Sequence, residues 1–197
     1  LNPRRLERYL TVAWDSGAQP VLVLTKADLC EDVEAARERI AALAPDVPLH
    51  TVSAYTGEGL DALWQYIGGN RTVALIGSSG VGKSTLINRM LGSARMEVGT
   101  TREDDKGRHT TTHRELFVLP QGGLVIDTPG MRELGLMESD EGLRTAFTDI
   151  EELAAGCRFS NCRHEKEPGC AVHEAIRGGQ LAPERLESYL KLGQEVA

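Results

Sequence analysis

Short apolar runs alternate with helical periodicity along the first two thirds of the chain. Mainly apolar runs lie at 21–24, 49–52 and 72–76, and between them apolar residues recur every three or four positions. A short apolar run is typical of a strand buried on both faces, and the wider period is typical of a helix. The pattern predicts an α/β fold, a mostly parallel sheet flanked by helices.

A helix is predicted at the start of the chain, where Asn2 can cap it and Pro3 takes its first position. Its core-facing residues would be Leu6, Leu10, Ala13 and Trp14. A pair of strands in a hairpin is predicted at 115–126, around the turn at 120–123.

Beyond residue 138 the pattern is mostly helical, with one helix expected from about residue 139 and a last one near 183–190. No internal repeat or low-complexity tract appears in the sequence. We therefore expect an α/β domain at 1–138 and a small, mostly helical C-terminal domain at 139–197.

Composition narrows the function classes. The chain has 22 Lys and Arg against 29 Asp and Glu, a net charge of −7, so a nucleic-acid partner would need a local basic patch. A hydrophobic fraction of 41% excludes a disordered or collagen-like chain. Neither a run of about 18 apolar residues nor a secretory signal is present, so we expect a cytoplasmic protein outside the membrane. The first residue is Leu rather than Met, which suggests an internal fragment.

A phosphate-binding loop is predicted at 77–84, which fits G-x-x-x-x-G-K-[ST] and lies between a predicted strand and a predicted helix. In such a loop backbone N–H groups surround the phosphates, Lys83 reaches the terminal phosphates and the Ser84 hydroxyl ligates Mg²⁺. The nucleotide-binding residues would be Gly77, Ser78, Ser79, Gly80, Val81, Gly82, Lys83, Ser84 and Thr85.

A second phosphate-sensing element follows the apolar run at 124–126. Asp127 can hold the hydration shell of Mg²⁺, and the N–H of Gly130 can meet the γ-phosphate. A threonine from 110–112 could ligate the same Mg²⁺. Thr111 and Thr112 are better placed than the first, and the choice between them stays open.

Guanine recognition is predicted at the ends of the first two strands. Asp28, in the run Thr25, Lys26, Ala27, Asp28, can accept two hydrogen bonds from the guanine ring, which adenine cannot donate. The stem of Lys26 can pack on the base. The pair Ser53 and Ala54 can offer a backbone N–H to the exocyclic guanine oxygen. The cofactors expected are therefore GTP or GDP with Mg²⁺.

A metal site is predicted in the C-terminal domain. Its ligands would be Cys157, Cys162, His164 and Cys170. Three thiols and an imidazole suit one tetrahedral, structural Zn²⁺ with no open position. A chance cluster of thiols and a pair of disulfides are the alternatives, and Cys30 stands apart. His173 is either a reserve ligand or a helix-surface residue.

These elements resemble those of TRAFAC GTPases in a circularly permuted order, because the base motifs precede the phosphate loop. Thr25 stands where most such proteins have Asn. With the zinc spacing and the run 167–172, Glu-Pro-Gly-Cys-Ala-Val, the chain from about 5 to 189 resembles the ribosome small-subunit-dependent GTPase A family (RsgA/YjeQ). Members carry an N-terminal OB-fold domain, and this sequence starts after its end.

The resemblance implies a GTP hydrolase that binds the small ribosomal subunit and its rRNA late in assembly. It would be stimulated by the subunit and would leave in the GDP form. We expect a monomer without a DNA partner. Basic residues at 102, 106, 108 and 114, and at 158, 163 and 166, could form RNA-facing patches or solvated faces.

Catalysis requires a water-positioning group. Met131 follows Gly130, and a methionine cannot orient water as the glutamine found there in many small GTPases does. Our hypothesis is that His109 does so; a plain loop residue or RNA contact is the alternative. The catalytic set would be Lys83, His109, Thr111 and Thr112.

Three other functions compete with this interpretation. The chain could be a nucleotide-gated RNA- or ribosome-binding module with incidental hydrolysis, or a permuted GTPase acting on another ribosomal particle. It could also be a zinc-stabilised RNA-binding protein with a vestigial nucleotide site. The intact Lys83, Ser84, Asp127 and Asp28 argue against the last.

Overall fold

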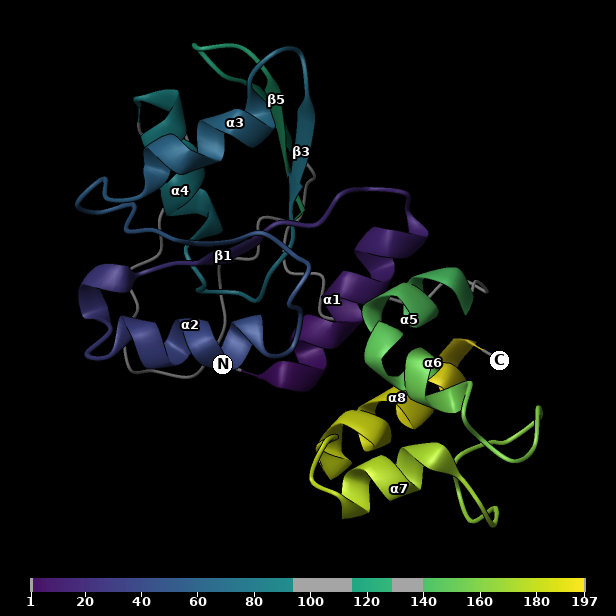
Figure 1. Ribbon diagram of the computed structural model, residues 1–197. Helices are drawn as coiled ribbons and strands as arrows, with labels where there is room; N and C mark the ends of the chain where they lie inside the picture. The colour runs from purple at the N-terminus through teal and green to yellow at the C-terminus, as the bar shows by residue number, and fades with distance from the viewer. Residues whose placement is uncertain (1, 94–114, 129–139, 197) are drawn as a thin grey trace. The chain divides into compact units, whose positions relative to one another are not determined.

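The strands in the first two thirds of the chain, residues 21–128, pair as the apolar runs predict (Figure 1). The computed structural model describes residues 2–93, 115–128 and 140–196. β1 and β2 are parallel, as are β3 and β5, and β4 pairs antiparallel with β5 in the predicted hairpin. The bounds are β1 (Leu22–Leu24), β2 (Leu49–Thr51), β3 (Thr72–Leu75), β4 (Glu115–Val118) and β5 (Leu124–Asp127).

Within the described ranges the strands form two hydrogen-bonded sets, β1-β2 and β3-β5-β4, and not the single sheet that was expected. The two sets are joined beyond their strand ends instead. The Thr25 hydroxyl, just after β1, donates to the carbonyl of Val81 in the loop after β3, at 2.6 Å. The carboxyl ends of β1 and β3 therefore face one site.

The helices of this region follow the strands. They are α2 (Val33–Ala41), α3 (Trp64–Ile67) and α4 (Lys83–Leu91), with short 3-10 helices η1 (Ala27–Leu29) and η2 (Leu60–Leu63). The predicted helix at 60–67 is thus a 3-10 turn continued by α3. Gly59 begins it with φ 73°, and a Cβ there would lie 2.2 Å from the Thr51 carbonyl oxygen, so only glycine fits.

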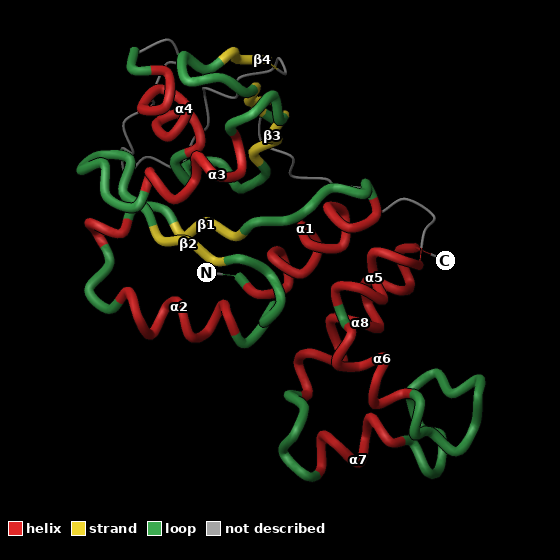
Figure 2. Tube along the Cα trace, turned by 45° about the horizontal axis from the view of Figure 1, so that its top comes forward, coloured by secondary structure: helices red, strands yellow, loops and turns green. Residues whose placement is uncertain are grey.

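The core of this region lies between its strands and helices. Figure 2 shows α2 beside β1 and β2, and α3 and α4 pack against β3 and β5. The most deeply buried side chains are Val52, Leu63, Ile67, Ile87, Leu119 and Val125. All of them lie in predicted strands and helices, although β3 is only partly buried and not covered on both faces as its apolar run predicts.

The chain divides into two compact units. The sheet unit is Val21–Glu133, and the helical unit combines Leu1–Pro20 with Leu134–Ala197. The first helix therefore clusters with the C-terminal helices and not with the sheet that follows it. The functional domain limits at 138 and 139 stay a prediction.

The helical unit contains five helices in the described part of the chain: α1 (Pro3–Asp15), α5 (Asp140–Ala146), α6 (Thr148–Ala154), α7 (Ala171–Arg177) and α8 (Pro183–Val196). Asn2 caps α1 as predicted, accepting the Arg5 N–H at 3.2 Å. The single helix expected from 139 is two helices, because Phe147 leaves helical geometry with φ −125°. Phe147 is fully buried between them.

The buried face of α1 differs from the predicted one. Leu10 is buried, but Leu6, Ala13 and Trp14 are only half-buried, whereas Glu7 is 2% exposed. Glu7 is satisfied by side chains from α8: Arg185 donates to it at 2.9 Å, and the hydroxyl of Ser188 donates as well. Hydrogen bonds to residues far away in the sequence thus allow the polar side chain of Glu7 to be buried.

Arg185, in α8, connects four helices of this unit. Besides Glu7 in α1, its guanidinium bonds both Asp149 oxygens in α6 at 2.9 Å and the Ala146 carbonyl at the end of α5 at 2.8 Å, and it lies 4.1 Å from the centre of the Phe147 ring. A buried charge with several partners is costly to leave unpaired, so this network fixes how α1, α5, α6 and α8 meet.

None of the helices in the described ranges is both long enough and apolar enough to cross a bilayer.

Candidate functional site

The phosphate loop connects β3 to α4, as predicted. Gly82 precedes α4 with φ 103°, a backbone conformation that favours glycine. The Lys83 ammonium donates to the carbonyls of Gly77 at 2.7 Å and Ser78 at 3.2 Å. Burial lowers the pKa of Lys83, while nearby Asp127 raises it. The lysine is therefore held over the loop that would carry the phosphates.

Asp127 ends β5 beside the phosphate loop. It is opposite Leu75 in the parallel ladder and is 2% exposed, and its Oδ1 is buried with no hydrogen-bond partner among the described residues. Burial raises its pKa, Lys83 lowers it and Glu115 raises it. A buried carboxylate oxygen without a donor is suited to a hydrated cation, so Asp127 fits the predicted Mg²⁺ site together with Ser84 at the first turn of α4.

The base-recognition residues lie on two linked loops. The hydroxyl of Ser53 donates to Asp28 Oδ1, and the N–H of Ala27 donates to the Val52 carbonyl at 3.2 Å. The N–H of Ser53 is used within its own loop by the Glu58 carbonyl at 3.0 Å. The N–H of Ala54 makes no hydrogen bond to any described residue, so Ala54 is the member of the pair that can meet the base.

The sequence analysis missed the role of the Ser53 side chain. It considered only the backbone N–H groups of the Ser-Ala pair. The contact between Ser53 and Asp28 joins residues 25 positions apart. The sequence feature that could have predicted it is a hydroxyl residue at the end of β2, the strand that pairs with β1. Ser53 is fully buried, and its hydroxyl leaves the second oxygen of Asp28 for a ligand.

Thr25 replaces the usual asparagine and still reaches the phosphate loop, through the 2.6 Å bond to Val81. Lys26 has φ 59°, and its Cε lies beside Gly82, 4.0 Å from the point where a Cβ on that glycine would be. Thr25 and Lys26 thus bring the base motif and the phosphate loop together.

Thr25→Val is expected to weaken GDP binding by about fivefold, since it removes a hydrogen bond worth about 1 kcal/mol between the two loops. Titration with a fluorescent GDP analogue measures the effect. Thr25→Ser keeps the hydroxyl and should bind as the unchanged protein does. Equal affinity in the valine variant would show that the loops do not depend on this bond.

The four predicted zinc ligands converge. Their ligand atoms all lie within 4.8 Å of one another. His164 Nδ1 is 3.6 Å from Cys157 Sγ and 3.4 Å from Cys170 Sγ, and these two sulfurs are 3.9 Å apart. Tetrahedral Zn²⁺ places two sulfurs about 3.8 Å apart, and a sulfur and a nitrogen about 3.6 Å apart. The distances among Cys157, His164 and Cys170 therefore match those of a tetrahedral zinc site, and Cys162 lies close enough to supply a fourth ligand.

The two kinds of ligand differ in their protonation. Burial raises the pKa of Cys162 to about 11, and hydrogen bonds with Cys170 and Cys157 add to the shift, so a cation must displace the thiol proton when it binds. Burial lowers the pKa of His164, which favours the neutral imidazole that binds metals. His173 lies outside the cluster: its Nε2 donates to the carbonyls of His164 and Glu165, each at 3.0 Å.

Several predicted site residues cannot be placed. His109, Thr111, Thr112 and Gly130 lie outside the described residues. The structure brings together the phosphate loop, Asp127 and the base motif in the sheet unit, and the four zinc ligands in the helical unit.

The order of these elements defines the class of protein. Base recognition at 25–28 and 53–54 precedes the phosphate loop, and Asp127 follows it. This is a P-loop GTPase of circularly permuted order. The crystal structure of YloQ, described as a circularly permuted GTPase, matches with a TM-score of 0.67 and 28% identity, covering 100% of this chain and 63% of that one.

The family follows from a closer match. The RsgA GTPase family model matches residues 1–137, and the chain belongs to this family. The Small ribosomal subunit biogenesis GTPase RsgA 2 of Listeria monocytogenes is 52% identical over 197 residues, 100% of this chain and 57% of the relative. The Methanosarcina acetivorans protein named Small ribosomal subunit biogenesis GTPase RsgA is 51% identical over 198 residues, covering 100% and 54%.

Solved structures agree with the assignment. YjeQ from Thermotoga maritima matches with a TM-score of 0.70 and 29% identity, covering 100% of this chain and 66% of that one. The chain spans little more than half the length of the curated relatives it matches.

Proposed function

We propose that the protein is a GTPase of ribosome biogenesis that acts on the small ribosomal subunit. The observation that carries the proposal is that one unit contains the phosphate loop, the Ser53-Asp28 pair and an Asp127 oxygen that has no hydrogen-bond partner among the described residues. The names of the relatives, which are about half identical over the whole chain, support the subunit as partner.

In this proposal the chain's residues bind and orient GTP. Lys83 would leave the loop carbonyls for the β- and γ-phosphates, and Asp28 with Ala54 would select guanine. Ser84, Asp127 and one of Thr111 and Thr112 would hold Mg²⁺, which when bound neutralises charge on the phosphates. Gly130 would contact the γ-phosphate, and His109 would orient the attacking water.

The zinc ligands would serve structure and not chemistry. Cys157, Cys162, His164 and Cys170 would supply all four ligands of a tetrahedral Zn²⁺, so no position would be open to a substrate. Cys170 also belongs to the core of the helical unit, with 3% exposure. We infer one structural Zn²⁺ that stabilises this small core.

The partners proposed are the small subunit and its rRNA, with no DNA and no membrane. We call the segment 157–170, which carries the four proposed metal ligands, the zinc loop. The basic side chains of Arg158, Arg163 and Lys166 in this loop would face RNA despite the net charge of −7. We propose that the protein acts as a monomer in the cytoplasm.

The experiment that tests the function is phosphate release from GTP with and without purified small ribosomal subunits, with ATP as the nucleotide control. We expect slow release alone and strong, GTP-specific stimulation by the subunit. GDP binding without stimulation would favour a nucleotide-gated binding module or a different ribosomal particle, and large subunits added in parallel separate these two outcomes.

A variant in the same assay tests the water-positioning proposal. His109→Ala should bind GTP normally and lose most of the stimulated release. Unchanged stimulated turnover would remove His109 from the mechanism.

A further inference from the structure

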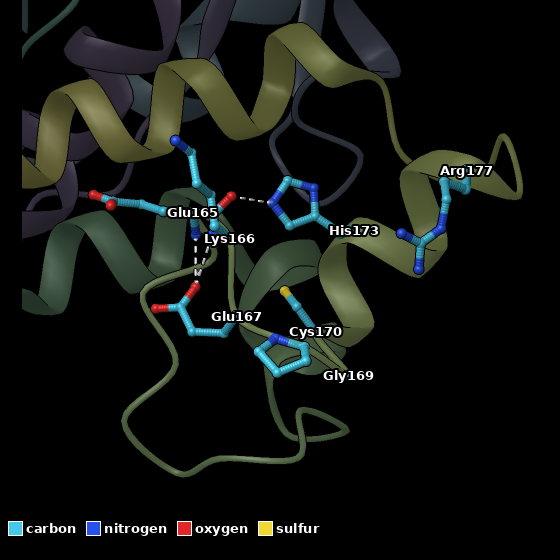
Figure 3. Close-up of a pocket in the computed structure, with 8 residues that line it drawn as sticks. Glu165, Lys166, Glu167, Gly169, Cys170, His173 and Arg177 are labelled. Atoms are coloured by element: carbon cyan, nitrogen blue, oxygen red, sulfur yellow. Dashed lines mark hydrogen bonds between the residues drawn. The ribbon is translucent and has the colours of Figure 1, made fainter.

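The zinc loop contains a turn whose backbone N–H groups converge on one carboxylate (Figure 3). Glu167 accepts the N–H groups of Arg163, Glu165 and Lys166, each at 3.0 Å. These hydrogen bonds lower the pKa of Glu167 to about 2, and the N–H of Arg163 contributes most to the shift. Successive N–H groups that point inward form an anion-binding nest, and here the protein's own side chain fills it.

The opposite side of the same turn is held by α7. His173 donates from Nε2 to the carbonyls of His164 and Glu165, each at 3.0 Å. Figure 3 shows the His173 ring directed at the loop, on the other side of it from Glu167. The N–H groups and the carbonyls of this turn are thus fixed by two different side chains.

The residue at the centre of this turn is a zinc ligand. His164 has φ 56°, in the left-handed region, which is unfavourable for a residue with a Cβ. Its ring is 6% exposed and points Nδ1 toward the sulfurs of Cys157 and Cys170. The conformation that delivers the imidazole is therefore unfavourable by itself and requires support from neighbours.

We propose that Glu167 and His173 are positioning residues that set the backbone of the zinc loop, so that His164 meets the metal without reorganisation. The proposal rests on the zinc site proposed above. Neither residue touches the metal; each acts through the backbone of the ligand-bearing turn. Fixing a ligand in advance raises metal affinity, because the ordering cost does not fall on the binding step.

A carboxylate is required at position 167 for a chemical reason. Its two oxygens accept three N–H groups, whereas a glutamine amide would present an NH₂ group to at least one of these donors. Glu167→Gln keeps the size of the side chain, and the open pocket beside it, about 340 Å³, accommodates the amide. The substitution thus tests charge and hydrogen bonding and not packing.

The test uses the full chain and Zn²⁺ in equilibrium competition with a chromogenic chelator. We expect Glu167→Gln and His173→Leu each to lower zinc affinity by about 10- to 100-fold. His173→Gln, which retains a side-chain N–H donor, should recover most of the affinity. The matched control is Glu165→Gln, an exposed carboxylate of the same loop whose side chain makes no interaction within the described structure; its affinity should stay within about twofold.

The outcomes separate this inference from the zinc site itself. Zinc binding by the unchanged chain with equal affinity in Glu167→Gln and His173→Leu overturns the positioning role and leaves the site standing. If the unchanged chain binds no zinc, both proposals fall. Far-UV circular dichroism of the zinc-saturated variants, expected to match that of the unchanged protein, separates lost affinity from lost folding.

Discussion

Replacing Asp28 with asparagine is expected to weaken GDP and GTP binding by about 100-fold or more. The carboxylate is the acceptor for two guanine donors, and an amide would turn an NH₂ group toward them. The contact with Ser53 decides the orientation, because its hydroxyl donates to Oδ1 and would hold the asparagine carbonyl there. The amide nitrogen is then directed at the base, so the variant loses its acceptor.

The same geometry supplies the control. Xanthine carries a carbonyl where guanine carries its amino group, so Asp28→Asn should bind xanthosine diphosphate better than the unchanged protein does. Titrating both proteins with both diphosphates measures the exchange of preference, while pyrophosphate binding should stay constant. Equal GDP affinity in the two proteins would mean that Asp28 does not read the base.

The parts of the site that the sequence predicted are local. The phosphate loop needs a strand, a run of glycines and a helix start in consecutive residues, and the structure has β3, the loop and α4 in that order. The same holds for the hairpin of β4 and β5, whose turn lies between adjacent apolar runs. The backbone conformation of a few consecutive residues defines such elements, and the residue types in that short segment are enough to predict it.

The parts that were missed depend on contacts between distant residues. Glu7 is polar and sits on a face where leucine and tryptophan were expected to point inward, because Arg185 and Ser188 are 178 and 181 positions away. The grouping of α1 with the C-terminal helices follows from its packing against α5 and, to a lesser extent, α8. The periodicity of side chains along one helix does not show which charged residue from a distant part of the sequence will pack against that helix.

The zinc loop shows both cases in one segment. The four ligands were predicted from spacing and converge in the structure. Glu167 was noted only as part of a family-like run, and its three N–H bonds depend on the left-handed backbone at His164. A histidine in that conformation cannot be anticipated from composition, since the residue type does not require it.

Loss of the metal is expected to unfold the helical unit while the sheet unit keeps binding GDP. Cys170 is buried beside Phe147, Ile150 and Val172, so without a cation this core contains clustered thiols and a neutral imidazole that have no common partner. Structural zinc contributes several kcal/mol, and each kcal/mol shifts the melting midpoint of a small domain by about 4–8 °C. Chelation or Cys170→Ser should therefore lower the midpoint of this unit by more than about 10 °C.

Differential scanning calorimetry measures the melting midpoint of each unit, and added GDP shows which transition belongs to which unit. GDP should raise the transition of the sheet unit, which carries Asp28 and Lys83, and identify it. The matched control is Cys30→Ser, which removes an exposed thiol from the sheet unit and should change neither transition. If chelation leaves both transitions in place, the core of the helical unit is stable without metal, and the convergence of the four ligands would then reflect packing alone.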